Sequence, residues 1–529
     1  EGQPLGIDKT DKSTWLVQTD NSPTVVVQYE LFADSINDRT RYADDNHAYL
    51  SGSSVFLYTD ERRHEPRRVV VDAPPHWRTA TGLDPDPTVP GAWVARDYDV
   101  LVDSPFEIGE HQLIEFDIRG VPHEYVLWGR YDGLDFDRLV ADTIAITEHQ
   151  ADIFGDMPYG RYVFMVHSAP GFGGGTEHLN STIMQTRPTT WRDDDAYNRF
   201  LGLVSHEMFH TWNVKRLRPA GLTPYEYQRE NYTDLLWVAE GTTSYYDDLT
   251  LARTGIITLD DYLDGLARTI GSVNRRPGRD LQSLRGSSFD AWVKFNRPTD
   301  DSGNSTVNFY SQGALVSLLL DLEIRRLTQD QRSLDDVLRD LYERHPLGAG
   351  GFTTADLLAG LQRVSGEDLA WFVDTYVGRP VRLDDALTEA FARVGLLLER
   401  DEPDDDQPAY LGILTRDEDG FAGVRGLLAE SPAYDAGIIA GDVIIAINNV
   451  RATPGEIDAV LTRCAGGETI TLSVMRRDEL RTFDIAVDAP RSDTWTLEQA
   501  EAPTPSHQAA FEAWLHVPWD AGNSSDAQE

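Results

Sequence analysis

The sequence predicts a multidomain α+β protein, and three of its features support that fold class. The 529 residues exceed the size of one ordinary domain. Short β-branched and aromatic runs fill the first quarter of the chain, whereas helical periodicity fills the middle. An acidic, Pro-containing linker at residues 401–407 then separates a small module from the rest. We predict domains at residues 1–135, 136–250, 251–400 and 408–490, followed by a C-terminal tail at 491–529.

The composition argues against several classes of partner. Hydrophobic residues make up 40% of the chain, yet no apolar run approaches the roughly 18–20 residues of a membrane span. The formal net charge of −41 repels nucleic acid and anionic membranes, so we expect neither as a partner. Only 4 of the 47 basic residues are lysine, which suits a salt-adapted cell and a GC-rich genome equally well.

The compartment is only weakly indicated. The single cysteine, Cys464, precludes an internal disulfide and fits a reducing compartment. The opening Glu-Gly-Gln-Pro is not a signal peptide, although a trimmed chain would have lost its signal. We therefore favour a cytoplasmic location slightly over a periplasmic or secreted one.

The first 135 residues are predicted to form a β-sandwich-like domain. Residues 24–32, 54–58 and 68–71 are β-branched and aromatic runs, separated by Asp, Asn, Pro and Gly. Nothing in this part of the chain has a catalytic pattern.

A Gly-rich segment follows a predicted helix at residues 136–154 and a predicted strand at 162–167. Its sequence is Gly-Phe-Gly-Gly-Gly-Thr-Glu, ending at Glu177, and it lacks the Gly-Lys-Ser/Thr of a phosphate-binding loop. It is either a flexible hairpin or a strand edge that a substrate backbone can approach closely. In the second case Gly174 and Gly175 lie on that edge and Glu177 is its polar group.

A His-Glu-x-x-His pattern lies within a helix predicted at residues 195–211. His206 and His210 are four residues apart, so on a helix they face the same side and can bind one Zn²⁺ at roughly 2.0–2.1 Å. Glu207 projects beside such a metal and can act as the general base toward an attacking water. The alternative is a helix that merely carries two histidines.

Three glutamates downstream are candidates for the third ligand. Glu226 and Glu230 lie in polar, loop-like sequence. Glu240 follows Leu-Trp-Val-Ala, where an uncompensated carboxylate would be costly and a buried metal would remove that cost. The alternative for Glu240 is a salt-bridged glutamate of the core, and we favour the ligand.

Residues 251–400 are predicted to be mainly helical. A helix at residues 312–327 is preceded by Asn-Phe-Tyr-Ser, so that Tyr310 falls at a loop-to-helix junction. A tyrosine there usually packs, but in a zinc hydrolase its hydroxyl could donate to a developing oxyanion.

Four separated motifs occur in an order that matches a known class of enzyme. Gly-Gly-Thr-Glu177-His precedes His-Glu-x-x-His, Trp-Val-Ala-Glu240-Gly follows it, and Tyr310-Ser-Gln-Gly comes later. This order resembles zinc aminopeptidases of the gluzincin type, such as aminopeptidase N. The fuller string His-Glu-Met-Phe-His-Thr-Trp-Asn-Val-Lys-Arg-Leu-Arg-Pro resembles the PDZ-containing glycyl aminopeptidase family, and the likeness covers roughly residues 5–490.

The resemblance implies a β-rich N-terminal domain, a thermolysin-like catalytic domain, a helical domain and a PDZ domain. It implies one zinc per chain, with the ligands and base at His206, His210, Glu240 and Glu207. Glu177 matches the residue that holds the free α-amine of a substrate, and Tyr310 matches the oxyanion-stabilising tyrosine. The family favours N-terminal glycine and, less strongly, alanine. Its chains carry further strands ahead of residues 9–15, which favours a processed or truncated chain here.

The module at residues 408–490 begins with a segment that resembles the carboxylate-binding loop of PDZ domains. Backbone N–H groups of such a loop capture a peptide C-terminus while the peptide adds as a strand. The alternative is a module used only for packing or dimerisation. The loop comprises Tyr410, Leu411, Gly412 and Ile413.

The sequence therefore favours a zinc aminopeptidase that acts on peptides with a free N-terminus. One alternative is a PDZ adaptor on an inactive peptidase scaffold, which the intact set of ligands and base disfavours. The other is a zinc endopeptidase, which Glu177 disfavours because an endopeptidase has no free amine to bind.

Overall fold

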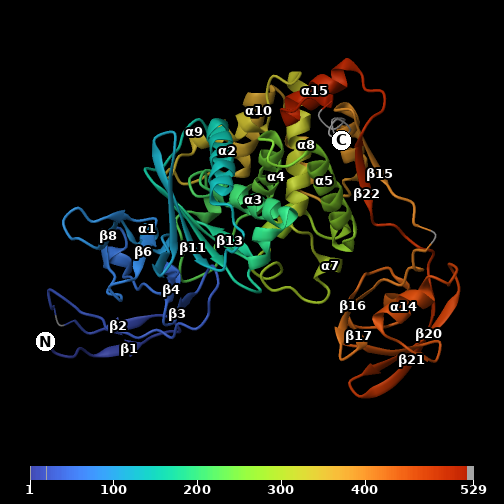
Figure 1. The fold of residues 1–529 in the computed structure, drawn as a ribbon, viewed down its shortest axis with the longest axis horizontal. Helices are drawn as coiled ribbons and strands as arrows, with labels where there is room; N and C mark the ends of the chain where they lie inside the picture. The colour runs from blue at the N-terminus through green and yellow to red at the C-terminus, as the bar shows by residue number, and fades with distance from the viewer. Residues whose placement is uncertain (1, 20, 405, 521–529) are drawn as a thin grey trace.

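A five-stranded mixed sheet connects the N-terminal domain to a large group of helices (Figure 1). The computed structural model describes residues 2–19, 21–404 and 406–520. The strand order is β10-β11-β12-β14-β13, in which β12 is parallel to both neighbours and β13 lies at an edge. The strands are β10 (Gln112–Ile118), β11 (Val121–Gly129), β12 (Tyr162–Ser168), β13 (Gly174–Glu177) and β14 (Ser181–Thr186).

This sheet changes the predicted boundary of the N-terminal domain. Residues 112–129 were expected in a domain ending at residue 135, but β11 pairs with β12 and so belongs to the central sheet. A strand joins the sheet in which its backbone finds a ladder partner, and composition alone does not identify that partner. The N-terminal domain therefore ends near Gly109.

The N-terminal domain is β-rich, as predicted. Its strands form a four-stranded sheet, a three-stranded sheet and the hairpin β1-β2. The elements are β1 (Ile7–Lys9), β2 (Trp15–Val17), β3 (Arg41–Ala43), β4 (His47–Leu50), β5 (Arg67–Val70), β6 (Arg78–Thr81), β7 (Asp84–Pro85), β8 (Ala92–Ala95), α1 (Tyr98–Val102) and β9 (Phe106–Gly109).

Two of the three strands predicted in this domain do not form. Residues 24–32 are β-branched but largely exposed, and no described strand pairs with them. Residues 54–58 follow a short 3₁₀ turn and pack Phe56 against the domain core without pairing in a sheet. A strand needs a ladder partner as well as β propensity. The third predicted strand, residues 68–71, corresponds to β5.

Helices pack against one face of the central sheet (Figure 1). Aspartate caps begin the two that lie against it: Asp135 accepts from the N–H of Arg138 before α2, and Asp193 accepts from Ala196 before α3. The helices are α2 (Phe136–Phe154), α3 (Asp194–Phe209), α4 (Thr243–Arg253), α5 (Leu259–Asn274), α6 (Leu284–Phe289), α7 (Ser302–Ser305), α8 (Ser311–Thr328), α9 (Leu334–Arg344), α10 (Thr354–Ser365), α11 (Ala370–Tyr376) and α12 (Asp384–Arg393).

The segment predicted as a C-terminal tail is instead folded onto the helices as far as residue 520. Strand β22 (Trp495–Gln499) pairs with β15 (Leu396–Arg400), and α15 (Pro505–Leu515) buries Trp514 completely. The Trp514 indole donates to the hydroxyl of Tyr245 at 2.8 Å. The polar composition obscured the few aromatic residues that anchor this segment. Residues 521–529 of the predicted tail lie outside the described residues.

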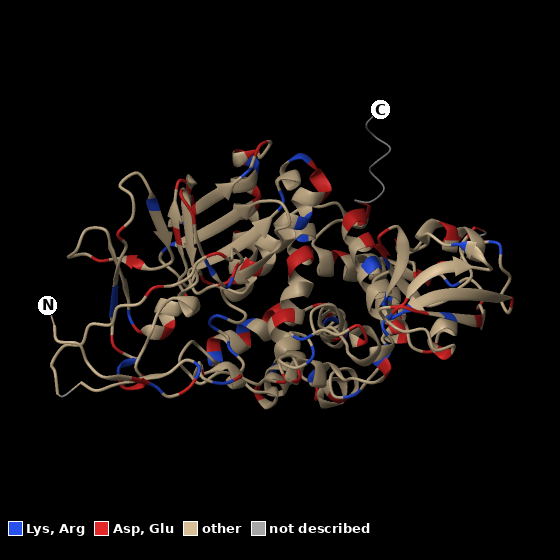
Figure 2. Cartoon of the chain, turned by 90° about the horizontal axis from the view of Figure 1, so that it is seen from below, with Lys and Arg blue, Asp and Glu red and all other residues tan. Residues whose placement is uncertain are grey.

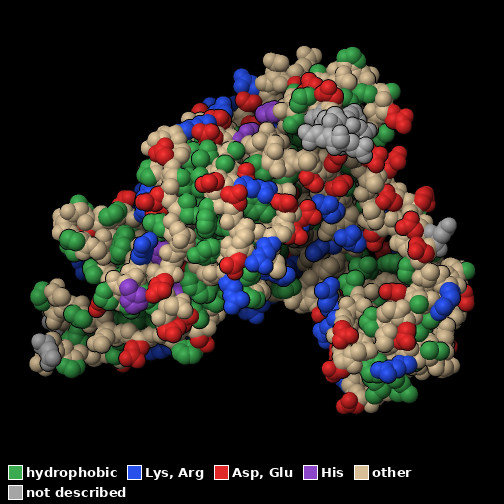
Figure 3. Space-filling view, in the orientation of Figure 1, with side chains coloured by type: hydrophobic (Ala, Val, Ile, Leu, Met, Phe, Trp, Pro, Cys, Tyr) green, Lys and Arg blue, Asp and Glu red, His purple; other side chains and the backbone are tan. Residues whose placement is uncertain are grey.

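The PDZ domain stands off from the body of the molecule (Figure 3). Asn304 of α7 joins the two, because its side-chain amide donates to Leu427 O and accepts from Ala429 N, both at 2.8 Å. The elements are β16 (Ile413–Glu418), β17 (Phe421–Leu427), α13 (Pro432–Asp435), β18 (Val443–Ile447), β19 (Val450–Arg451), α14 (Pro454–Leu461), β20 (Thr469–Arg476) and β21 (Glu479–Ala486).

Acidic residues occur throughout the chain and are not gathered in one region (Figure 2). Among the helices that the structure describes, none combines the length and apolar character needed to cross a membrane.

Candidate active site

Helix α3 brings the two histidines of the motif together. His210 N donates to His206 O at 3.2 Å, so the helical geometry continues one residue past the end of α3. The ring centroids of His206 and His210 are 4.6 Å apart. His210 is buried and His206 is partly buried. The spacing of four residues therefore produces the shared face that the sequence predicts.

Glu240 joins these histidines from a π-helical turn at Trp237–Thr242, directly before α4. Its Oε2 lies 3.3 Å from His210 Nε2 and 3.6 Å from His206 Nε2. The other two candidates, Glu226 and Glu230, are exposed in a loop and do not approach the histidines. Single π turns are frequent at functional sites, because they re-aim one side chain within a helix.

The geometry of these three side chains fits a tetrahedral zinc ion. Ligands about 2.0–2.1 Å from a tetrahedral centre lie roughly 3.3 Å apart, close to the separations observed. Burial disfavours charged imidazoles, yet the surrounding carboxylates, Glu240 foremost for His210, raise the pKa of both histidines. The same negative field would favour a bound cation.

Two partners of the histidines were not found from the sequence. His206 Nδ1 lies 3.1 Å from Asp247 Oδ2, and His210 Nδ1 lies 2.7 Å from Asn213 O. Such contacts orient metal-binding imidazoles and present Nε2 to the metal. A local signal existed for each, since Asp247 is two helical turns beyond Glu240 and Asn213 is three residues beyond His210.

The side chain of Glu207, on α3, projects toward the edge strand β13. A Cβ added to Gly175 would lie 2.6 Å from Glu207 Oε1, so only glycine leaves room for this carboxylate. The other oxygen, Oε2, is buried and has no hydrogen-bond partner among the described residues. Burial raises the pKa of Glu207 to about 7, with further increases from Glu177 and Glu240 that the two histidines oppose. A carboxylate so tuned is suited to accept and return a proton near neutral pH.

Tyr310 occupies the junction predicted for it, immediately before α8. Its ring is stacked against that of His206 at a centroid distance of 6.1 Å, and Phe309 and Phe295 pack on it. Burial, followed by the charges of Glu240 and Glu177, raises the pKa of the Tyr310 hydroxyl. The hydroxyl therefore keeps its proton and can donate a hydrogen bond.

Strand β13 carries Gly174, Gly175 and Glu177 at the free edge of the sheet. Gly175 and Glu177 share the face toward α3, since side chains two residues apart along a strand point the same way. Glu177 is near enough to Glu207 and Tyr310 for its negative charge to raise the pKa of both.

Two aspartates of the N-terminal domain accept hydrogen bonds from this hairpin and the residues after it. Thr176 Oγ1 donates to Asp38 Oδ2 at 2.5 Å on the opposite face of β13. After the strand, the N–H of Leu179 donates to Asp103 Oδ2 at 2.9 Å. Asp103 Oδ1 is also 2.6 Å from Nζ of Lys215, which follows α3 in the chain. Burial would raise the pKa of the Asp103 carboxyl, but Lys215 and His178 together hold that pKa well below its usual range.

A cavity of about 450 Å³ opens between these elements. His206, Glu207 and Tyr310 line it, together with two residues that were not predicted, Arg199 and Asp248. The cavity therefore exposes one histidine, the base and the tyrosine to a ligand.

The loop at residues 410–413 lies at the start of β16, an edge strand against which α14 packs. The N–H of Tyr410 donates to Asp488 O at 3.0 Å, so this amide is already paired. Gly412 has φ +75°, and an added Cβ would lie 2.2 Å from that of Ser431. If the loop binds a carboxylate, the amides for it come from residues after Tyr410.

Comparison with known proteins places this geometry in a family. Residues 199–316 match the model for the M61 glycyl aminopeptidase, residues 1–110 match the peptidase M61 N-terminal domain, and residues 409–487 match a PDZ domain. The chain resembles an aminopeptidase N family protein from Idiomarina loihiensis at 30% identity and a TM-score of 0.88, covering 97% of this chain and 90% of the other. The chain belongs to the M61 glycyl aminopeptidase family. It is a peptidase, as the sequence predicts.

More distant similarity adds little. An M1 zinc metallopeptidase from Deinococcus radiodurans is 16% identical over 66% of this chain and 73% of the other, with a TM-score of 0.43. None of the curated proteins matches the chain.

Proposed function

We propose that this M61 peptidase is a zinc aminopeptidase that removes N-terminal residues from peptides, glycine first and alanine next. The observation that supports it best is the convergence of His206, His210 and Glu240 at ligand spacing, with Glu207 and the edge strand β13 beside them. The preference for glycine rests on the family to which the chain belongs.

The chain would hold the zinc ion through His206 Nε2, His210 Nε2 and one oxygen of Glu240. When bound, zinc polarises the scissile carbonyl and acidifies the attacking water. Glu207 takes the proton of that water and returns it to the leaving amine. The Tyr310 hydroxyl donates a hydrogen bond to the oxyanion that develops on the former carbonyl oxygen. Such a hydrogen bond stabilises mainly the transition state.

Glu177 would restrict cleavage to the first peptide bond. Its carboxylate pairs with the α-ammonium of a substrate whose backbone lies along Gly174 and Gly175. An acylated N-terminus offers no charge to this carboxylate and would leave it desolvated and unpaired, which is a strong basis for discrimination.

Hydrolysis of Gly-, Ala- and Leu-p-nitroanilide, with and without a chelator, tests the proposal. We expect the rate to fall in that order, to vanish with chelator and to return with added zinc. N-acetyl-Gly-p-nitroanilide should not be cleaved. Glu177→Ala should lose most of the advantage of the free amine while keeping its zinc, and Glu226→Ala, an exposed glutamate outside the site, serves as the matched control. Equal cleavage of acetylated and free peptides would favour the endopeptidase alternative.

The PDZ domain is proposed to bind the C-terminus of a peptide at residues 411–413. The free edge of β16 beside α14 supports this, because a peptide can add there as a strand. Fluorescence polarisation with a labelled C-terminal peptide library should detect binding that amidation of the C-terminus abolishes. Absence of binding across the library would favour the packing or dimerisation alternative.

A further inference from the structure

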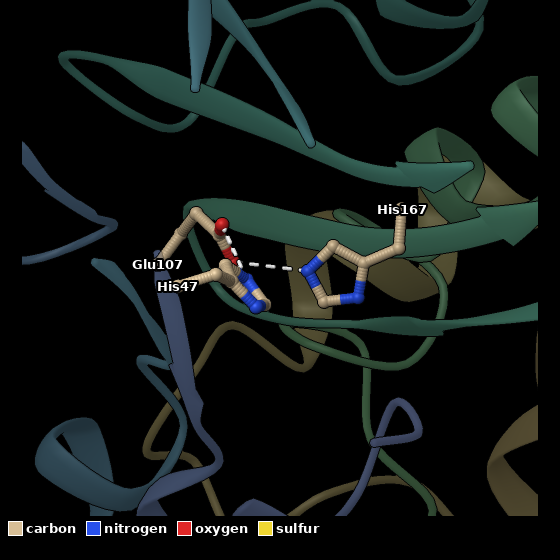
Figure 4. Close-up of side chains that lie close together, drawn as sticks. All are labelled: His47, Glu107 and His167. Atoms are coloured by element: carbon tan, nitrogen blue, oxygen red, sulfur yellow. Dashed lines mark hydrogen bonds and ion pairs between the residues drawn. The ribbon is translucent and has the colours of Figure 1, made fainter. Parts of the chain in front are cut away.

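A second cluster of metal-ligating side chains lies outside the catalytic cleft. It comprises His47 on β4, Glu107 on β9 and His167 on β12, so the N-terminal domain supplies two residues and the central sheet supplies the third (Figure 4). One ligand atom of each lies within 4.8 Å of the others. All three residues are 0% exposed. No step of the proposed peptidase mechanism uses them.

Hydrogen bonds within the protein do not satisfy this cluster. His167 Nε2 and Glu107 Oε2 form a hydrogen bond of 2.9 Å. His47 Nε2 is 2.7 Å from Glu107 Oε1, yet the two atoms are not in hydrogen-bond geometry. Within the described part of the chain, Glu107 Oε1, both ring nitrogens of His47 and Nδ1 of His167 have no hydrogen-bond partner. Burying a carboxylate and imidazoles in this way costs stability unless something else pairs them.

We propose that His47, Glu107 and His167 bind a second zinc ion with a structural role. A cation can pair with nitrogen and oxygen atoms that lie close together without being hydrogen-bonded to each other, as His47 Nε2 and Glu107 Oε1 do. Two imidazoles and one carboxylate are a donor set typical of Zn²⁺ and equal to that of the catalytic site. Complete burial leaves no access for a substrate, so the ion would join the N-terminal domain to the central sheet.

The cluster must open slightly to accept this ion. Its N···O separations of 2.7 and 2.9 Å are shorter than the 3.3 and 3.6 Å of the catalytic ligands. Tetrahedral zinc spaces its ligands by roughly 3.3 Å, so the atoms would move apart by about 0.5 Å. Aromatic packing already orients the rings: Trp128 is stacked on His47 at 4.1 Å, and Tyr49 meets His167 edge-on at 5.1 Å. These contacts hold the ring planes without the Nδ1 hydrogen bonds seen at the catalytic histidines.

Counting zinc per chain by inductively coupled plasma mass spectrometry tests the second site. We expect two zinc ions in the wild type and one in the His206→Ala/His210→Ala variant, which keeps the second site intact. His47→Gln/His167→Gln should also retain one. His123→Gln is the matched control, because His123 is another buried histidine of the central sheet but bonds to Tyr159 and Val121, and it should retain two.

A cobalt titration covers the case in which His47→Gln/His167→Gln does not fold. Metal-free His206→Ala/His210→Ala should take up one equivalent of Co²⁺ and develop visible d–d absorption. One zinc in the wild type, with none and no cobalt uptake in His206→Ala/His210→Ala, would overturn the second site while leaving the proposed function intact. Failure of the proposed function has a different result, namely zinc that survives in His206→Ala/His210→Ala beside a wild type without chelator-sensitive activity.

Discussion

Replacing Gly175 by alanine should disable the general base without disturbing the fold or the ligands. The added Cβ would lie 2.6 Å from Glu207 Oε1, 2.8 Å from Cδ and 3.0 Å from Cγ. Ordinary contact begins near 3.4 Å, so the carboxylate has to retreat by about 0.8 Å. The backbone of Gly175 is not in the left-handed region, so alanine adds no strain there.

The expected loss follows from this displacement. Moving a catalytic group by about 1 Å can cost on the order of 10²-fold in rate. We therefore expect kcat of Gly175→Ala to fall by roughly 10- to 100-fold. KM should change less, because the strand backbone that would lie beside the substrate stays in place. The zinc content should equal that of the wild type.

Steady-state kinetics on Gly-p-nitroanilide, paired with metal analysis, measures both quantities. Gly173→Ala is the control, because a Cβ there meets no atom within 4 Å and the backbone is unstrained. The Glu207→Asp background adds a second check: its shorter side chain relieves the collision, so Gly175→Ala should cost much less there. A Gly175→Ala enzyme with full zinc and a kcat within about threefold of the wild type would refute the placement of Glu207 against β13.

Three further predictions concern other parts of the molecule. Tyr310→Phe should lower kcat by ~10²–10³-fold with little change in KM, as for other oxyanion donors, and a pure KM effect would reassign Tyr310 to substrate binding. Lys215→Met removes the lysine partner of the partly buried Asp103, which keeps its contacts with His178 and Leu179, and should reduce the free energy of unfolding by about 3 kcal/mol in urea titrations, whereas an unchanged value would contradict the role of this pair. Burial, and then the charge of Arg253, lower the pKa of His149 to about 4 in the folded state against 6.5 when unfolded. The unfolded chain thus binds the extra proton first, so stability should fall from pH 6.5 toward 4 by up to roughly 3 kcal/mol, and thermal denaturation of His149→Gln should show a flatter pH profile.

Local sequence was enough to predict helix α3 and its neighbours. The spacing of His206 and His210 acts within one helix, and Glu240 stood out as a carboxylate in an apolar run. The predicted helix at residues 136–154 coincides with α2, because a capping Asp at its start and Gly155 at its end mark it within the sequence itself. The order of the motifs was also enough to predict the M61 family, because it depends on residue identity and spacing alone.

Other features depend on partners far away in the chain, which no local pattern encodes. Residues 24–32 have strand propensity but find no described partner, whereas β10 and β11 find theirs in the central sheet. The terminal segment looked polar, yet Trp514 anchors it in a core built from helices more than 100 residues earlier.

The contrast between local and long-range determinants is clearest for the residues that contact the candidate site and its strand. The sequence by itself determined that His206 and His210 share one face of a helix with Glu207 beside them, because this needs only side chains at short spacing within one element. Tertiary structure alone decided that Asp38 and Asp103 hold that strand, and that His47, Glu107 and His167 meet in one buried cluster. Those contacts join residues 60 to 138 positions apart, and their pairing follows from which strands share a sheet and how two domains pack.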